Sequence, residues 1–215
     1  MLSHEEIKRF YDNFGKRQDW QFYERAAFDK LIDYGQMDKA SAVFELGCGT
    51  CQLAYRAFKE VLPANAHYVG VDISSTMLDL CKERMQPFAD RIELKLSSGA
   101  LPFDRASAWA DRFISSYVLD LLPEVEISAV IMEAHRILTR GGLICLAGLT
   151  QGVNRRSKLI AKIWATLFRL KASAVGGCRP ISIGRHIDNK LWELVHHETI
   201  VSAWIPSEVL IARKR

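Results

Sequence analysis

A glycine-rich stretch after an apolar run contains the first residues that could do chemistry. The nine residues VFELGCGTC, 43–51, place Glu45 two positions before Gly47 and Gly49 two positions after it. Glycine lets the backbone approach a ligand closely, and free N–H groups at the start of a helix can bind polar groups. A second acid, Asp72, ends the apolar run YVGVD. At the end of a neighbouring strand, this carboxylate could accept hydrogen bonds from both hydroxyls of a ribose.

Two other nucleotide-binding loops do not fit the stretch. The dinucleotide fingerprint G-x-G-x-x-G needs glycine or alanine at position 52, where the chain has Gln52. A phosphate-binding P-loop needs a GK[ST] sequence, and none follows these glycines. The pattern that fits is E-x-G-x-G, formed by Glu45, Gly47 and Gly49.

The hydrophobic pattern predicts the elements that must position these residues. Apolar runs rich in Val, Ile and Phe predict strands near 42–46, 67–72, 91–96, 111–117 and 142–149. Apolar residues three and four apart predict helices over 52–62, 75–86 and 124–139. This alternation is typical of βαβ units and a parallel sheet. The strand-like segments 198–205 and 207–214, joined at Pro206 and Ser207, predict a closing antiparallel hairpin.

Length and composition narrow the class of protein. With 215 residues, 49% hydrophobic and 25% charged, the chain is expected to form a single domain over residues 1–215. A net charge of +4 is too small for the dense basic face of a nucleic-acid enzyme, so we expect no nucleic-acid partner. The charged N-terminus lacks a secretory signal. Five cysteines without framework spacing favour free thiols and a cytoplasmic location.

The glycine loop is one of three motifs that occur in order: ELGCGT at 45–50, GVDIS at 70–74 and HRILTRGGLICLAG at 135–148. Together they resemble the class I S-adenosylmethionine-dependent methyltransferases, over about residues 40–150. The resemblance implies an α/β, Rossmann-like, seven-stranded and mostly parallel sheet with an antiparallel last strand and helices on both faces. It also implies S-adenosylmethionine as cofactor. Because this cofactor carries a sulfonium, an α-amino group and a carboxylate but no phosphate, its site needs acids as well as backbone donors.

The resemblance assigns roles to residues near the motifs. Glu45 would hold the amino-acid end of the cofactor, and Asp72 would bind the ribose. Gly47, Cys48 and Gly49 would surround the methionine part. The adenine would be bordered by Ser97, Ser98 and Gly99, and Ile73 and Met77 would contact its ring. The last candidate for cofactor binding is Ser115.

The chain departs from the family pattern at two positions. A third glycine is usual where Cys51 stands, so this residue must have an ordinary helical φ or turn its side chain away from the ligand. An aspartate is frequent where Ser97 stands, and Ser97 or Ser98 would accept from the adenine amine instead. Cys48 and Cys51 form a C-x-x-C pair, but no second ligand pair has zinc spacing, so we expect no metal.

The segment FISSYVLDLLP, 113–123, would face the transferred methyl group in such an enzyme. Its polar residues predicted to border the methyl acceptor are Ser115, Ser116, Tyr117 and Asp120. Asp120 is the predicted base for an acceptor that keeps a proton, and Tyr117 would orient it. A capping or surface role before Pro123 is the alternative for Asp120. Tyr11 and Phe14, from an aromatic N-terminal segment, would complete the substrate pocket.

Two further segments are expected to be helical and to cover the site. Residues 1–35 would form a lid, with an aromatic stripe packed on the sheet as an equal alternative. Residues 150–190 would form an insertion or lid, in which 153–171 make a basic amphipathic helix. Such a helix can cap a pocket or lie on an anionic bilayer, and the core or lid role is favoured.

Three functions remain open. The leading one is methyl transfer to a small-molecule acceptor, apolar or aromatic, at O, N or C. The second is lipid or quinone methylation at a membrane surface, which would need peripheral membrane contact. The third is a cofactor-binding module without turnover. Nothing in the sequence fixes the oligomeric state.

Overall fold

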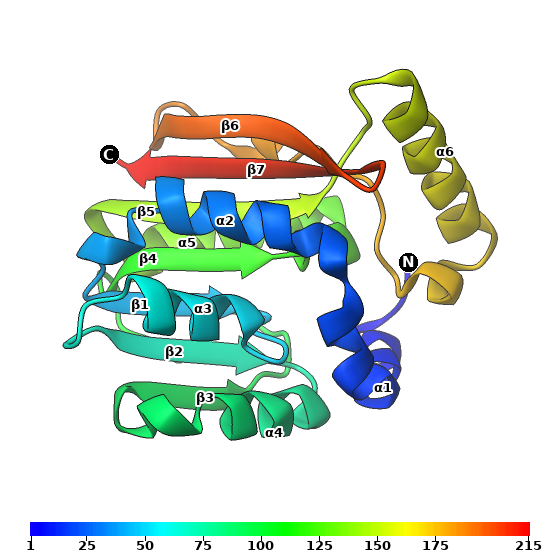
Figure 1. The fold of residues 1–215 in the computed structure, drawn as a ribbon. Coiled ribbons are helices and arrows are strands. Elements are labelled where there is room, and N and C mark those ends of the chain that lie inside the picture. The colour runs from blue at the N-terminus through cyan, green and yellow to red at the C-terminus, as the bar shows by residue number, and fades with distance from the viewer.

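Seven strands form one continuous sheet in the computed structural model, which describes residues 1–215 (Figure 1). The strands lie in the order β3-β2-β1-β4-β5-β7-β6. Their bounds are β1 Ala42–Leu46, β2 His67–Asp72, β3 Ile92–Leu96, β4 Ala110–Ser116, β5 Leu138–Leu149, β6 Trp192–Ser202 and β7 Ile205–Lys214. Strands β1 to β5 pair in parallel, and β7 is antiparallel to both its neighbours. The predicted Rossmann-like sheet with an antiparallel last strand is confirmed.

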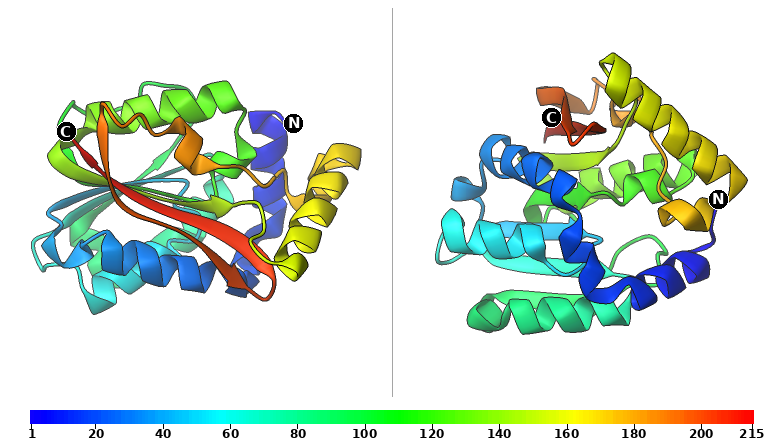
Figure 2. Two further views of the ribbon diagram at one scale, coloured as in Figure 1. Left: turned by 90° about the horizontal axis from the view of Figure 1, so that it is seen from above. Right: turned by 45° about the vertical axis from the view of Figure 1, so that its right-hand side comes forward.

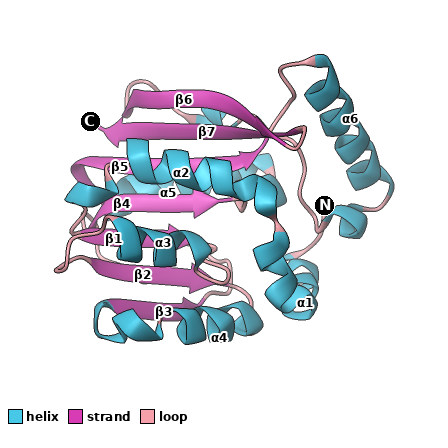
Figure 3. Ribbon diagram, viewed as in Figure 1, coloured by secondary structure: helices cyan, strands magenta, loops and turns pink.

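Helices cover both faces of this sheet (Figures 2 and 3). On one face, α2 (Arg25–Tyr34), α3 (Gln52–Glu60) and α4 (Ser75–Arg84) share a core cluster with Val43 and Ile114. On the other face, α5 (Glu124–Ile137) packs on Phe44 and Phe113. Because both faces are covered, the parallel strands are almost continuously apolar and buried, as VGV in β2 illustrates.

Helix α1 (His4–Phe14) lies beyond the carboxyl ends of the parallel strands rather than on a face of the sheet (Figure 1). It begins with a capping box, in which the Ser3 hydroxyl accepts from the Glu6 N–H and the Glu6 carboxylate accepts from the Ser3 N–H. The Ser74 hydroxyl donates to Asp12 at 2.6 Å, which ties the helix to the end of β2. Of the expected lid, α1 thus lies over the strand ends, whereas α2 is a core helix.

Short 3-10 segments connect these helices. Residues Gly15–Trp20 and Phe22–Glu24 lead from α1 to α2. The first of them is anchored through Asp19, which accepts a 2.6 Å hydrogen bond from the Thr50 hydroxyl and pairs with Arg84. This anchor joins the N-terminal segment to the glycine loop.

Helix α6 (Arg155–Leu170) projects from the sheet, on the side where the N-terminus lies (Figure 1). Its apolar stripe, for which a core or lid role was expected, is only partly covered by the rest of the chain. Trp164 is half-buried and donates from Nε1 to the Cys178 carbonyl at 3.1 Å. Leu159, Ile163 and Leu167 are exposed. No helix of the chain combines the length and apolarity that crossing a bilayer requires.

The closing hairpin differs from the prediction in its turn. The strands are joined by Ala203 and Trp204, whose φ values of +47° and +69° are left-handed. Such values suit a two-residue hairpin turn. Pro206, which we expected in the turn, lies inside β7 opposite Val201.

Cys51 and Cys81 are joined by a disulfide, so the expectation of five free thiols is wrong. Cys51 precedes α3 and Cys81 lies in α4, 30 residues later, yet their Cα atoms are 4.9 Å apart. The sulfur of Cys48 belongs to the same buried group, in which the three sulfur atoms lie within 4.8 Å of one another. Spacing along the chain could not show this grouping, because it depends on how α4 packs beside the glycine loop.

Candidate functional site

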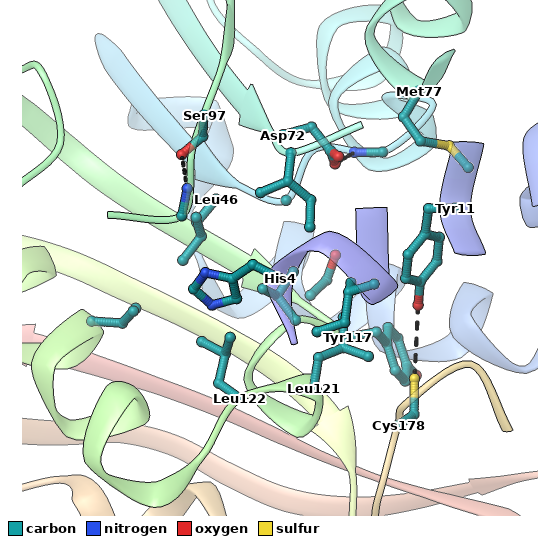
Figure 4. Close-up of a pocket in the computed structure, with 18 of the residues that line it drawn as sticks. His4, Tyr11, Leu46, Asp72, Met77, Ser97, Tyr117, Leu121, Leu122 and Cys178 are labelled. Atoms are coloured by element: carbon teal, nitrogen blue, oxygen red, sulfur yellow. Dashed lines mark hydrogen bonds between the residues drawn. The ribbon is translucent and has the colours of Figure 1, made fainter. Parts of the chain in front are cut away.

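A cavity of about 450 Å³ lies at the carboxyl ends of β1, β2 and β4, under α1 (Figure 4). Ligands of open parallel sheets bind at this edge, in pockets of roughly 300–1,000 Å³. Most of the predicted site residues line the cavity: Tyr11, Gly47, Gly49, Asp72, Ile73, Met77, Ser97, Ser98, Gly99, Ser116 and Tyr117. It extends from Ser97 past Asp72 to Tyr11, Tyr117 and Cys178.

The glycine loop and Asp72 form one hydrogen-bonded unit. Gly47 has a φ of +70°, and a Cβ there would lie 2.1 Å from a Val118 methyl group, so only glycine fits. The Gly49 N–H donates to Asp72 Oδ2 at 2.9 Å, and the Ser74 N–H donates to Oδ1 at 2.9 Å. Burial raises the pKa of Asp72, and these N–H groups oppose that rise. Each carboxylate oxygen keeps a lone pair that can accept from a ligand hydroxyl.

Glu45 and Cys48 do not line the cavity, contrary to prediction. Side chains alternate along a strand, so Glu45 points to the face opposite Leu46, which does line it. The Tyr68 hydroxyl donates to the Glu45 carboxylate at 2.6 Å, and burial raises the pKa of Glu45 to about 8. Cys48 is buried on the same side as Tyr68. Both residues therefore lie on the core side of the loop and do not line the cavity.

Cys51 adopts the left-handed conformation where the family usually has glycine. Its φ is +59°, so the expected ordinary helical φ is wrong. The other alternative holds, because the side chain is turned away from the cavity and bonded to Cys81. A residue with a side chain is rare at such a φ, and here complete burial and the disulfide fix it.

Ser115 and Phe14 also lie off the cavity. Ser115 is on the opposite side of β4 from Ser116, and its buried hydroxyl has no hydrogen-bond partner. Phe14 stacks on Phe10 with ring centroids 5.4 Å apart, while Tyr11, one turn earlier in α1, does line the cavity.

Tyr117 lines the cavity, but Asp120 lies behind its wall. The Tyr117 hydroxyl is 2.8 Å from the Ser207 hydroxyl, and burial raises the pKa of Tyr117. Asp120 is fully buried because the chain turns under the end of β5, where the Leu149 N–H donates to Oδ2 at 3.0 Å. The other oxygen has no partner, and burial raises the pKa of Asp120 to about 7. The predicted direct contact of Asp120 with an acceptor is not what the structure shows.

Several lining residues were missed by the sequence reasoning. His4 Nε2 and Glu126 Oε2 meet at 3.0 Å, joining α1 to α5 beside Ser97 and Gly99. Tyr23 belongs to the aromatic segment already noted, but no local pattern marks Glu24. Val118, Leu121 and Leu122 lie in the segment 113–123, of which only the polar residues were singled out. The remaining missed residues are Ile7, Gln18, Gln21, Leu46, Leu101, Phe103, Val130 and Cys178.

Sheet order, helix placement and a cavity at the strand ends define a Rossmann-like protein with a site suited to a nucleoside-containing ligand. Comparison with known proteins agrees. Residues 43–142 match the family model of a methyltransferase domain. The matched domain and the fold support the class I S-adenosylmethionine-dependent methyltransferases, the family expected from its motifs. The cofactor of that family is S-adenosylmethionine.

Three individual proteins illustrate the similarity. A putative methyltransferase of Geobacillus sp. (strain WCH70) is 22% identical over 88% of this chain and 74% of its own length. A carboxy-S-adenosyl-L-methionine synthase of Pseudoalteromonas translucida is 25% identical over 54% of this chain, and the match spans only 46% of that relative. An O-methyltransferase family protein of Burkholderia thailandensis shares the fold with a TM-score of 0.69 at 12% identity, over 89% of this chain and 56% of that one.

Proposed function

We propose that this chain transfers the methyl group of S-adenosylmethionine to a small apolar or aromatic acceptor. The observation that carries the proposal is the single cavity in which Gly47, Gly49 and Asp72 face the same space as Tyr11 and Tyr117. A cofactor and an acceptor can therefore lie side by side, as direct methyl transfer requires.

The cofactor assignment follows from the residues that line the cavity between the glycine loop and Ser97. Asp72 accepts the ribose hydroxyls, and Gly47 and Gly49 admit the methionine part. The loop of Ser97, Ser98 and Gly99 borders the adenine, together with the side chains of Ile73 and Met77.

The acceptor occupies the end formed by Tyr11, Ser116 and Tyr117. Methyl transfer is a direct displacement, and holding the nucleophile about 3–3.5 Å from the methyl carbon supplies much of the rate. Helix α1 covers the site and excludes water, which strengthens the electrostatic interactions inside. Tyr117 orients the acceptor, whereas Asp120 acts from behind the wall through its charge.

Calorimetry and a turnover assay test the proposal. S-adenosylmethionine and S-adenosylhomocysteine should bind, and NAD should not, because the loop departs from the dinucleotide fingerprint. Incubation with S-adenosylmethionine and a panel of small phenols, amines and acids should then release S-adenosylhomocysteine. Tight cofactor binding without turnover on any acceptor would favour a binding module instead.

A second candidate, methylation of a lipid or quinone at a membrane surface, is favoured by the exposure of α6. Leu159, Ile163, Leu167 and Leu170 are 59%, 47%, 43% and 79% exposed and follow one side of the helix. The basic residues of this segment are Arg155, Arg156, Lys158, Lys162, Arg169 and Lys171. Such a helix can lie in the interface of an anionic bilayer.

Flotation with vesicles that contain phosphatidylserine tests this candidate. Docking predicts co-flotation that falls steeply with salt, because each basic residue near an anionic surface contributes about 1 kcal/mol that salt screens. Replacing Arg155, Arg156 and Lys158 with glutamine should abolish it while cofactor affinity stays unchanged. A protein that stays with the lipid-free fraction at low salt would remove the membrane function.

A further inference from the structure

The end of the cavity farthest from the adenine loop gathers three aromatic rings. Tyr11, Tyr23 and Tyr117 all line it, and the rings of Tyr23 and Tyr117 meet edge to face with centroids 5.6 Å apart. All three hydroxyls are already engaged by the protein, that of Tyr11 with Cys178 Sγ at 3.8 Å. Tyr23 donates to the Gln21 amide oxygen at 2.8 Å, and Tyr117 pairs with Ser207 at 2.8 Å. The rings themselves are what remains to meet a ligand.

Glu24 brings a carboxylate to this aromatic end. It lines the cavity although the residue is only 5% exposed. Its hydrogen bond comes from the Gln18 amide at 3.4 Å, and no cation pairs with it. The charged groups that act on it are the acids Asp120 and Asp19, and burial raises the pKa of Glu24 well above its usual range. A buried carboxylate without a cationic partner is costly, so a ligand that supplies positive charge suits it.

No basic side chain of the cavity can supply that charge. The lining residues include no lysine or arginine, and His4, the one histidine, pairs with Glu126 near the adenine loop. Arg179 lies nearby but donates to the Asp120 carbonyl at 3.2 Å and pairs with Glu124. Asp72 accepts from two backbone N–H groups, whereas Glu24 has neither a backbone donor nor a cationic partner, so its charge is the least compensated of the cavity acids.

We propose that the methyl acceptor is an amine, an apolar or aromatic molecule whose nitrogen lies between the Glu24 carboxylate and the rings of Tyr11, Tyr23 and Tyr117. The inference rests on the proposed methyl transfer and names its substrate class. A carboxylate binds an ammonium group through charge-assisted hydrogen bonds. Aromatic rings attract a cation within about 6 Å of their centroids. A phenol or alcohol of the same shape can donate a hydrogen bond to the carboxylate, but it brings no positive charge for the ion pair or for the rings.

Glu24 can also accept the proton that a bound ammonium must lose before its nitrogen reacts. The amine must be neutral to react, and the Glu24 carboxylate takes one proton from the bound ammonium, which frees the nitrogen lone pair. The nitrogen then bonds to the methyl carbon as the sulfur–carbon bond breaks, and the electrons of that bond stay on sulfur. The product is an N-methylated ammonium ion and a neutral thioether. Glu24 releases its proton to solvent when the products leave.

The test measures binding to the full chain saturated with S-adenosylhomocysteine. The probes are primary amines from methylamine to phenethylamine, each compared with the alcohol of the same carbon skeleton. We expect the best amine to bind at least tenfold more tightly than its alcohol. Glu24→Gln should remove this preference while the affinity for S-adenosylhomocysteine changes less than twofold. Asp33→Asn, an exposed acid on α2, is the matched control and should change neither affinity.

Further variants separate the charge from the fold. Tyr23→Phe keeps the ring and should retain the amine preference, whereas Tyr23→Leu should weaken amine binding several-fold. Both variants keep Glu24, so they test the inference even if Glu24→Gln destabilises the fold and lowers the urea midpoint of unfolding.

Three results would overturn the inference: no amine that binds better than its alcohol, an unchanged preference in Glu24→Gln, or a tenfold loss of S-adenosylhomocysteine affinity in that variant. The last would assign Glu24 to the amino group of the cofactor. Failure of the wild-type chain to bind S-adenosylhomocysteine would instead refute the proposed function itself.

Discussion

Substitution of Asp72 tests the site most directly, because this carboxylate joins the glycine loop to the proposed ribose position. Alanine removes the acceptor of the Gly49 and Ser74 N–H groups and both acceptors for a ribose. Hydrogen bonds to a charged group contribute about 1.5–3 kcal/mol, so Asp72→Ala should weaken S-adenosylmethionine binding by about 10–150-fold. Asparagine keeps one carbonyl acceptor, and Asp72→Asn should lie between alanine and wild type.

The assay is calorimetry with S-adenosylmethionine and S-adenosylhomocysteine at one pH and salt concentration, beside urea unfolding. Both ligands should lose affinity alike, because they share the ribose. The free energy of unfolding distinguishes a lost ligand contact from a disordered glycine loop. Each N–H group left unpaired in the folded protein should lower it by about 1–3 kcal/mol. Asp79→Asn, an exposed acid on α4, is the matched control. Unchanged affinity in Asp72→Ala would remove Asp72 from the ribose role and refute the reasoning.

Three further predictions concern the support of the site. Burial raises the pKa of Glu45 to about 8 from 4.5. The folded protein therefore holds this proton more tightly than the unfolded chain, and the free energy of unfolding should fall as pH rises from about 5 through 8. Urea midpoints measured across this pH range should change less in Glu45→Gln than in the wild type, and identical profiles would contradict the prediction. The disulfide between Cys51 and Cys81 closes a 30-residue loop, so its reduction should lower the free energy of unfolding by about 3–4 kcal/mol. Cys51→Gly should change cofactor affinity by no more than a few-fold, and calorimetry that finds no binding to this variant would disprove that expectation. Asp19→Ala removes the side chain that joins residues 15–20 to Thr50 and Arg84 beside the glycine loop. The dissociation rate of S-adenosylhomocysteine, measured by stopped flow, should then rise several-fold. An unchanged rate would show that this anchor does not help to retain the ligand.

The sequence alone was sufficient to predict the features that depend on patterns of neighbouring residues. Most strand and helix positions were predicted to within a few residues, because apolar periodicity follows from which faces of an element are buried. The exceptions are β5 and β6, which begin four and six residues earlier than predicted, at Leu138 and Trp192. The turn was equally visible from Gly47 and Gly49, since glycine favours the left-handed φ values of +70° and +52° that the two positions adopt. Asp72 was placed correctly because the ends of adjacent parallel strands meet at one edge.

Tertiary structure decided the rest of the site. Glu45 and Ser115 turned away from the cavity because strand side chains alternate and the register fixes which side faces it. Asp120 is buried behind the wall because the chain after β4 turns under the end of β5. The partner of Cys51 and the place of Glu24 depend on contacts between segments that no local spacing encodes. The sequence alone therefore predicted the fold and the cofactor. The packing of α1 and residues 15–24 across the strand ends decided which side chains line the aromatic end of the cavity, because these contacts join residues far apart in the chain.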